Sequence, residues 1–81
     1  MKVPVRLFAV ARQLAGQDRV TLELPEGATL AQLRARLAEE VPELAGLLDR
    51  IAMAVGTEYA DDGTTIPPDT EVACIPPVSG G

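Results

Sequence analysis

The residues best suited to chemistry are the last ones of the sequence, Pro76-Pro77-Val78-Ser79-Gly80-Gly81. Two consecutive prolines have no amide N–H and favour extended polyproline geometry, so they should end sheet pairing and project the residues that follow. Glycines carry no side chain, which lets a Gly-Gly end enter a narrow active-site channel of another protein. A terminal carboxylate has a pKa of about 3.5 and is unreactive until it is activated, most simply as an acyl-adenylate made with ATP. We therefore predict that Gly81 is the reacting residue.

Side chains elsewhere supply little catalytic chemistry. The sequence has no histidine and no glycine-rich phosphate loop, which excludes Ser-His and Cys-His pairs, histidine metal sites and an ATP site of those types. Asp61-Asp62-Gly63 is interpreted as a turn rather than a metal site, because no further ligands follow at regular spacing. The one cysteine, Cys74, is interpreted as a small buried hydrophobe rather than a sulfur relay. We expect no cofactor on this chain, so ATP and magnesium would act on a partner enzyme that activates Gly81.

Length and charge narrow the class of protein. With 81 residues the chain makes one domain, and its formal net charge is −5. Lys2 is the only lysine and the arginines are scattered, which argues against nucleic-acid binding. No run approaches the roughly 20 apolar residues of a membrane helix. A single cysteine agrees with a reducing compartment, and we expect a cytoplasmic location.

The first half of the chain must build the support for this tail. Val3, Val5 and Leu7 alternate with Pro4, Arg6 and Phe8 and predict a strand, which should pair fully only after its first residues because Pro4 lacks an amide N–H. Residues 9–15 predict a short helical turn ended by Gly16, and residues 20–24 predict a second strand antiparallel to the first.

The strongest prediction is a helix that begins at Thr29 and ends before Pro42. Thr29 and Gln32 match a capping box, and leucines at helical spacing form one apolar stripe. Residues 44–48 predict a brief helical turn, 51–55 a third strand, 58–65 a segment with a turn, and 71–75 the last strand.

This order predicts an α+β fold of the ubiquitin-like β-grasp type, with a mixed sheet packed on one main helix. In that fold the last strand lies parallel beside the first. The expected organisation is a β-grasp domain over residues 1–75 and an extended, flexible Gly-Gly tail over residues 76–81.

The sequence resembles the small subunit of molybdopterin synthase, the MoaD family, over nearly its full length. The specific part is the Pro-Pro-Val-Ser-Gly-Gly ending, supported by Val5-Arg6-Leu7-Phe8-Ala9 and Leu14-Ala15-Gly16. Two places depart from the family pattern. Family members often have Val-Asn where this chain has Val55-Gly56, and Asp-Gly-Asp-Glu-Val where it has Pro68-Asp69-Thr70-Glu71-Val72.

The resemblance implies a definite mechanism. An activating enzyme related to ubiquitin E1 would adenylate Gly81, and a sulfur donor would convert the adenylate into a thiocarboxylate. The tail would then enter the large subunit of a heterotetrameric synthase and give its sulfur to cyclic pyranopterin monophosphate, in molybdenum cofactor biosynthesis. This chain would be a sulfur-donating subunit with no activity alone.

Partner-binding candidates extend from the tail to its root: Gly80, Ser79, Val78, Pro77, Pro76, Ile75 and Phe8. For Phe8, an apolar contact with the partner and an ordinary core position are both open. Three other functions also remain open: a sulfur carrier for thiamine or transfer-RNA thiolation, a ubiquitin-like protein modifier, and a β-grasp interaction module without covalent chemistry.

Overall fold

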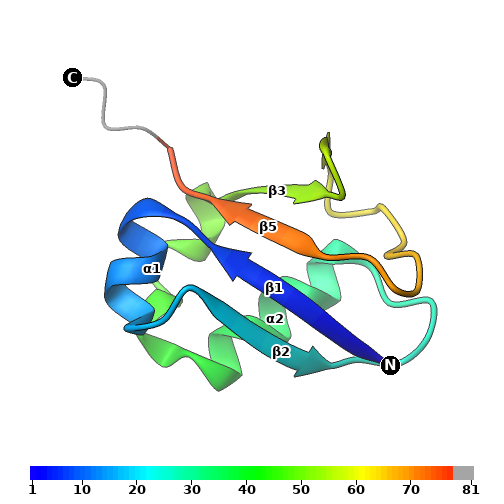
Figure 1. Cartoon of the computed structure of the whole chain (residues 1–81), viewed down its shortest axis with the longest axis horizontal. Coiled ribbons are helices and arrows are strands. Elements are labelled where there is room, and N and C mark those ends of the chain that lie inside the picture. Colours follow the sequence, from blue (N-terminus) through cyan, green and yellow to red (C-terminus); the bar gives the residue numbers. More distant parts are fainter. Residues whose placement is uncertain (78–81) are drawn as a thin grey trace.

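The computed structural model describes residues 1–77. The elements, in chain order, are β1 (Lys2–Leu7), α1 (Ala9–Ala15), β2 (Arg19–Glu23), α2 (Leu30–Glu40), the 3-10 turns η1 (Pro42–Leu44) and η2 (Leu48–Arg50), β3 (Ala52–Val55), β4 (Glu58–Ala60) and β5 (Val72–Ile75). The strands form one sheet in the order β2-β1-β5-β3-β4. β5 is parallel to β1, and the other neighbouring strands are antiparallel. α2 crosses one face of the sheet (Figure 1). The predicted α+β architecture with a mixed sheet on one main helix is confirmed.

Pro4 leaves the pairing of β1 with β2 intact, but β1 pairs on both sides only from Val5, as predicted. Registered pairs run from Lys2↔Glu23 onward and include Pro4↔Thr21. Hydrogen-bonded and non-hydrogen-bonded pairs alternate along an antiparallel ladder. Because Met1 and Leu24 exchange hydrogen bonds, Pro4 falls at a non-hydrogen-bonded position and its nitrogen faces away from β2. On that other side, β5 pairs only from Val5 onward.

The turn after β1 uses two left-handed backbone positions. Ala9 opens α1 with a φ of 52°, and Gly16 closes it with a φ of 73° while donating its amide to Arg12 O. The left-handed region is open to glycine without a steric cost, so Gly16 ends the helix as predicted. Ala9 has no such freedom.

α2 is held at its first turn by its own cap and by the loop after β4. Thr29 and Gln32 form the predicted capping box. The amides of Leu30 and Ala31 donate to the carbonyl oxygens of Thr64 and Asp62 at 3.1 and 3.0 Å. These bonds satisfy backbone donors that a helix start otherwise leaves free, and they fix the loop against α2.

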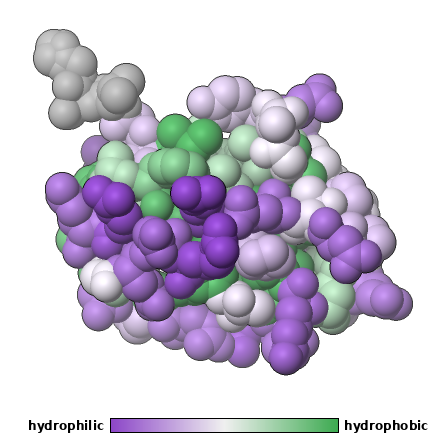
Figure 2. All heavy atoms as spheres, viewed as in Figure 1, coloured by the Kyte–Doolittle hydropathy of each residue, from purple (hydrophilic) through white to green (hydrophobic). Residues whose placement is uncertain are grey.

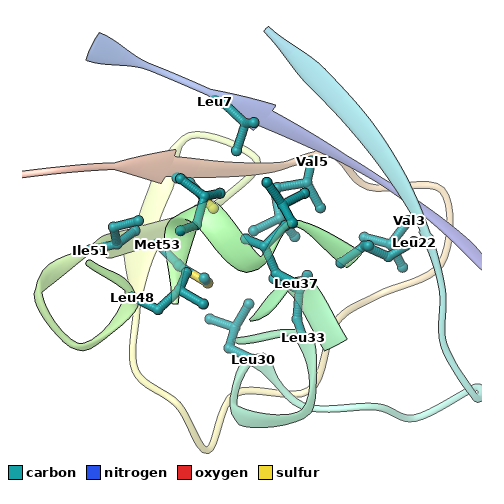
Figure 3. Packing of buried hydrophobic residues seen from close by; sticks show 14 of the residues in the cluster. Val3, Val5, Leu7, Leu22, Leu30, Leu33, Leu37, Leu48, Ile51 and Met53 are labelled. Carbon is teal, nitrogen blue, oxygen red and sulfur yellow. The ribbon is translucent and has the colours of Figure 1, made fainter. Parts of the chain in front are cut away.

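The core lies between α2 and the inward face of the sheet (Figure 3). α2 contributes Leu30, Leu33 and Leu37, all fully buried. They meet aliphatic side chains at alternate strand positions, among them Val3, Val5, Leu7, Leu22, Met53, Val72 and Cys74. Both aromatic residues of the chain lie outside this cluster.

β4 was not predicted. It pairs with β3 through Met53↔Ala60, Ala54↔Tyr59 and Val55↔Glu58. Three residues give too little alternation to indicate a strand, and the pairing depends on the reversal at Gly56, whose φ is 63°. β3 also begins one residue later than expected, because Ile51 ends η2.

Candidate functional site

The root of the C-terminal tail is built where β1 and β5 end side by side. Leu7 is in register with Cys74, and the Phe8 amide donates to Cys74 O at 3.3 Å. After Ile75 the chain leaves the sheet, with Pro76 buried and Pro77 exposed. In Figure 1 this segment leads away from the side that holds the N terminus. The remaining predicted site residues, Val78, Ser79, Gly80 and Gly81, lie outside the described residues.

An apolar surface adjoins this root on the face of the sheet opposite α2. Met53 and Cys74 point into the core, so their strand neighbours point outward. Register then places Ala52 beside Ile75, and Ala54 between Ala73 and Tyr59. Several apolar side chains on this outer face are not fully buried, and we call them the outer apolar patch: Phe8, Ala52, Tyr59, Ala73 and Ile75. Figure 2 shows apolar surface gathered below the tail and hydrophilic side chains over β1 and β2.

The chain's two aromatic side chains, Phe8 and Tyr59, both belong to this patch. Phe8 is 39% exposed and Tyr59 is 70% exposed, while the core is aliphatic. Aromatic side chains are enriched at protein–protein interfaces because they give large contact areas at low entropic cost. The exposure of Phe8 excludes its interpretation as an ordinary core residue. The sequence analysis missed Tyr59, although the rarity of aromatic residues in this chain was a usable signal.

Cationic side chains border the patch along β1 and β2. Arg6 and Arg19 are cross-strand partners, and like charges in that arrangement repel. Each has another contact: the Arg6 guanidinium carbon lies 5.6 Å from the Phe8 ring centroid, and Arg19 Nη2 lies 3.1 Å from Glu71 Oε2. A guanidinium over an aromatic face is a cation–π contact. The patch therefore combines an apolar centre with a polar rim.

Cys74 lies under the root but faces the core. Its side chain is fully buried, and desolvation raises the pKa of its thiol from 9.0 to about 12, against a smaller lowering by Arg34. Nucleophilic sulfur chemistry requires the thiolate. The expectation that Cys74 is a buried hydrophobe rather than a relay agrees with this geometry.

Comparison with known proteins adds to this geometry. The ThiS family profile matches residues 5–81. The chain belongs to the ThiS family. A relative from Arabidopsis thaliana, a molybdopterin synthase sulfur carrier subunit, is 35% identical over 81 residues, which are 100% of this chain and 84% of that protein.

Two solved structures extend the family likeness to the fold. SAMP1 of Haloferax volcanii, a small archaeal modifier protein, superposes with a TM-score of 0.89 at 27% identity and full coverage of both chains. A chain from the complex of subunits 1 and 2 of the molybdopterin-converting factor from Helicobacter pylori gives 0.71 at 26% identity, again with full coverage. The ubiquitin-like β-grasp fold and the resemblance to molybdopterin synthase small subunits are confirmed.

The two departures from the family pattern preserve backbone geometry. Gly56 and Asp69 have φ values of 63° and 58°, where the family often has asparagine and glycine. Glycine, asparagine and aspartate are the residues that best tolerate this region. Each change therefore exchanges one residue suited to a left-handed turn for another.

Asp61 and Asp62 are used within the fold. Asp61 Oδ1 accepts from the Gly63 amide and the Thr64 hydroxyl, both at 3.1 Å, while Asp62 Oδ1 lies 2.8 Å from Arg34 Nε. Among residues 1–77, no three acidic, histidine or cysteine side chains cluster as a metal site would require. The turn interpretation of Asp61-Asp62-Gly63 is confirmed. Separately, no helix in residues 1–77 is long and apolar enough to cross a bilayer.

Proposed function

We propose that this chain is the sulfur-carrier small subunit of a molybdopterin synthase, with the transferred sulfur carried on the carboxyl group of Gly81. The observation that carries the proposal is the full-length similarity to proteins of that name, including the Arabidopsis thaliana relative. The fold supports it, because β5 ends beside β1 and Pro76-Pro77 leads the chain away from the sheet. A reactive end at this place can enter another protein while the domain docks outside.

The proposed chemistry takes place in two partner enzymes. In an E1-like enzyme, a Gly81 carboxylate oxygen attacks the α-phosphorus of magnesium-bound ATP and pyrophosphate leaves. The outer sulfur of a persulfide on a donor protein then forms a C–S bond at the carbonyl carbon, and the C–O bond to AMP breaks. A second thiol of the partner enzymes attacks the S–S bond to the donor, forms a disulfide with the donor's inner sulfur and releases the carboxyl terminus as a thiocarboxylate. The resulting thiocarboxylate passes its sulfur to cyclic pyranopterin monophosphate in the large subunit. The one thiol of this chain, Cys74, is buried and takes no part in the transfer, so the catalytic side chains belong to the partner enzymes in this proposal.

The large subunit is the partner that the outer apolar patch fits. The Helicobacter pylori structure is a complex of subunits 1 and 2 of the molybdopterin-converting factor, which supports a large-subunit partner for this chain. We propose that Phe8 and Ile75 contact that subunit at the mouth of its active site, while Pro76 through Gly80 occupy the channel that leads to it. A heterotetramer with two small subunits in a reducing cytoplasm completes the proposed assembly.

The test is mass spectrometry of the chain after incubation with the E1-like enzyme, ATP, magnesium and a sulfur donor. Exchange of one oxygen for sulfur nearly matches the mass change of one oxidation, so the product is alkylated and mapped to the C-terminal peptide. We expect a label on Gly81 that disappears when large subunit and pterin precursor are added. A label that forms but is not consumed would favour a sulfur carrier for thiamine or transfer-RNA thiolation. Absence of the label with every donor would refute the sulfur-carrier function.

A protein modifier is the second candidate, favoured by the TM-score of 0.89 to SAMP1. In that function the activated Gly81 carboxyl forms an isopeptide bond with a lysine of a target protein. Conjugates that carry a C-terminal Gly-Gly remnant of this chain on target lysines in cell extract would support it. A chain lacking Gly81 that retains full function would exclude both covalent functions and leave an interaction module.

A further inference from the structure

Lysine is almost absent from this chain, although cationic residues are not. The sequence has six arginines and one lysine, Lys2. A lysine amine attacks an activated carboxyl group once it loses its proton, whereas the guanidinium of arginine stays protonated and does not. A second copy of this chain therefore offers an activated Gly81 one side-chain amine, that of Lys2.

Lys2 is accessible from solvent at the start of β1. Its side chain is exposed, and it alternates with the buried Val3 so that it lies on the outer face of the sheet. Within residues 1–77 no salt bridge involves its amine. Other nucleophiles are less available: the Cys74 thiol is fully buried, and the Met1 amine donates to Leu24 O at 2.6 Å.

The chain's own tail is too short to reach Lys2. Lys2 lies five residues before Leu7, which is in register with Cys74. About 16 Å of strand therefore separates Lys2 from the end of β1 that adjoins the tail root. Three further residues take the chain outward to Pro77, for a separation of roughly 25 Å. Four residues follow Pro77, and they span at most about 14 Å. The four-carbon stem of a lysine does not close the remaining gap of about 11 Å.

We propose that Lys2 is an acceptor site for the activated carboxyl terminus of a second copy of this chain. The ε-amine of Lys2 attacks the carbonyl carbon of the Gly81 adenylate, a C–N bond forms, and the C–O bond to AMP breaks. AMP leaves with the electron pair, and the amine proton passes to solvent. Because one copy offers one acceptor and one donor at opposite ends of the molecule, the products are linear chains with a single linkage type. This inference rests on the adenylation step of the proposed function.

The experiment incubates the full-length chain with the E1-like enzyme, ATP and magnesium, without a sulfur donor. Released pyrophosphate measures activation, and denaturing gels with peptide mass spectrometry measure covalent products. We expect dimers and longer chains joined by a Gly81–Lys2 isopeptide bond. Lys2→Arg keeps the positive charge and should give the same initial release of pyrophosphate, but should lower the dimer yield at least tenfold.

A second variant controls for reach. Arg6→Lys combined with Lys2→Arg moves the only lysine four residues along the same face of β1, towards the tail root. We expect the linkage to move to position 6 and to include a product formed within a single chain, since that position lies within the span of the tail.

The outcomes separate the two proposals. Pyrophosphate release without dimers, or dimers joined through Met1 or Cys74, overturns the assignment of Lys2 and leaves the proposed function intact. No pyrophosphate release overturns the activation step and the Lys2 inference with it. Dimers that persist unchanged in Lys2→Arg also overturn the assignment.

Discussion

At the scale of single residues, the least favourable backbone conformation sits next to the proposed partner surface. Ala9 has a φ of 52° directly after Phe8, at the point where β1 turns into α1. A left-handed conformation costs a non-glycine residue roughly 1–2 kcal/mol. This turn ends β1 and leaves Phe8 beside Ile75. The conformational strain of Ala9 therefore accompanies the exposed position of Phe8.

Replacing Ala9 by glycine should stabilise the fold. The relief of strain exceeds the extra entropy of an unfolded glycine, about 0.5–1 kcal/mol, so we expect a net gain of about 0.5–1 kcal/mol. Ala35→Gly in the exposed middle of α2 is the matched control and should lose about 1 kcal/mol. Urea unfolding of the three proteins measures both effects. A loss of stability in Ala9→Gly would show that the turn does not strain the chain.

Burial of Cys74 should make stability fall in alkaline solution. The pKa of its thiol is about 12 in the folded chain, raised by desolvation from 9.0. The unfolded chain therefore releases this proton first, so the contribution is complete below pH 9 and is lost as the pH rises towards 12. We expect a slope on the order of 1.4 kcal/mol per pH unit in this window.

Cys74→Ala isolates that contribution. The variant has no thiol to titrate, so its free energy of unfolding should fall less steeply between pH 9 and 12 than that of the parent chain. The comparison uses slopes because loss of the buried sulfur also lowers stability at neutral pH. Equal slopes in the two proteins would contradict the account.

At the scale of elements, one side chain of α2 ties down two loops. Arg34 Nε binds Asp62 Oδ1 at 2.8 Å in the loop after β4, and its Nη1 donates to Leu48 O in η2. Its side chain is 21% exposed, so these bonds are partly shielded from water. The planar guanidinium bridges both partners at once, which a lysine ammonium on its flexible stem does less well.

Arg34→Lys should therefore destabilise the chain by about 1–2 kcal/mol, because one partner loses its hydrogen bond while the charge is kept. Arg36→Lys is the control on the same helix. Arg36 pairs with Glu40 at the surface, with a 2.6 Å contact, and its substitution should change stability by less than about 0.5 kcal/mol. Thermal unfolding of both variants tests the difference, and equal losses would show that Arg34 is an ordinary surface residue.

The elements that sequence could predict are those that local chemistry determines. The capping box at Thr29 and the glycine at position 16 fix the helix ends directly. β4 could not be predicted, since three residues become a strand only by pairing with β3. For the same reason the outer apolar patch was only half predicted. Phe8 and Ile75 were named because they adjoin the tail, whereas Tyr59 joins them through the register of β3 with β4 and β5.

At the scale of the whole molecule, the tail root and the single lysine lie at opposite ends of β1. The tail leaves from the end where β5 and β1 finish, and the outer apolar patch adjoins its root. The single lysine lies at the far end of β1. With a formal net charge of −5, the molecule also favours approach to basic partner surfaces. Docking at the patch would orient the domain so that the tail points into its partner.

This arrangement predicts that docking and tail insertion contribute separately to binding of the large subunit. Phe8→Glu places a charge in the outer apolar patch and should weaken binding at least tenfold, since burying an unpaired carboxylate is costly. Val10→Glu is the matched control, because Val10 is also 39% exposed but lies on α1.

Calorimetric titration of the large subunit with each variant measures the two affinities, and the melting temperatures should match the parent chain within a few degrees. Deletion of Gly81 in the Phe8→Glu background should weaken binding by the same factor as in the parent chain, because the patch and the tail end are separate contacts. If Phe8→Glu binds as tightly as Val10→Glu, the tail alone carries the recognition and the patch has another partner.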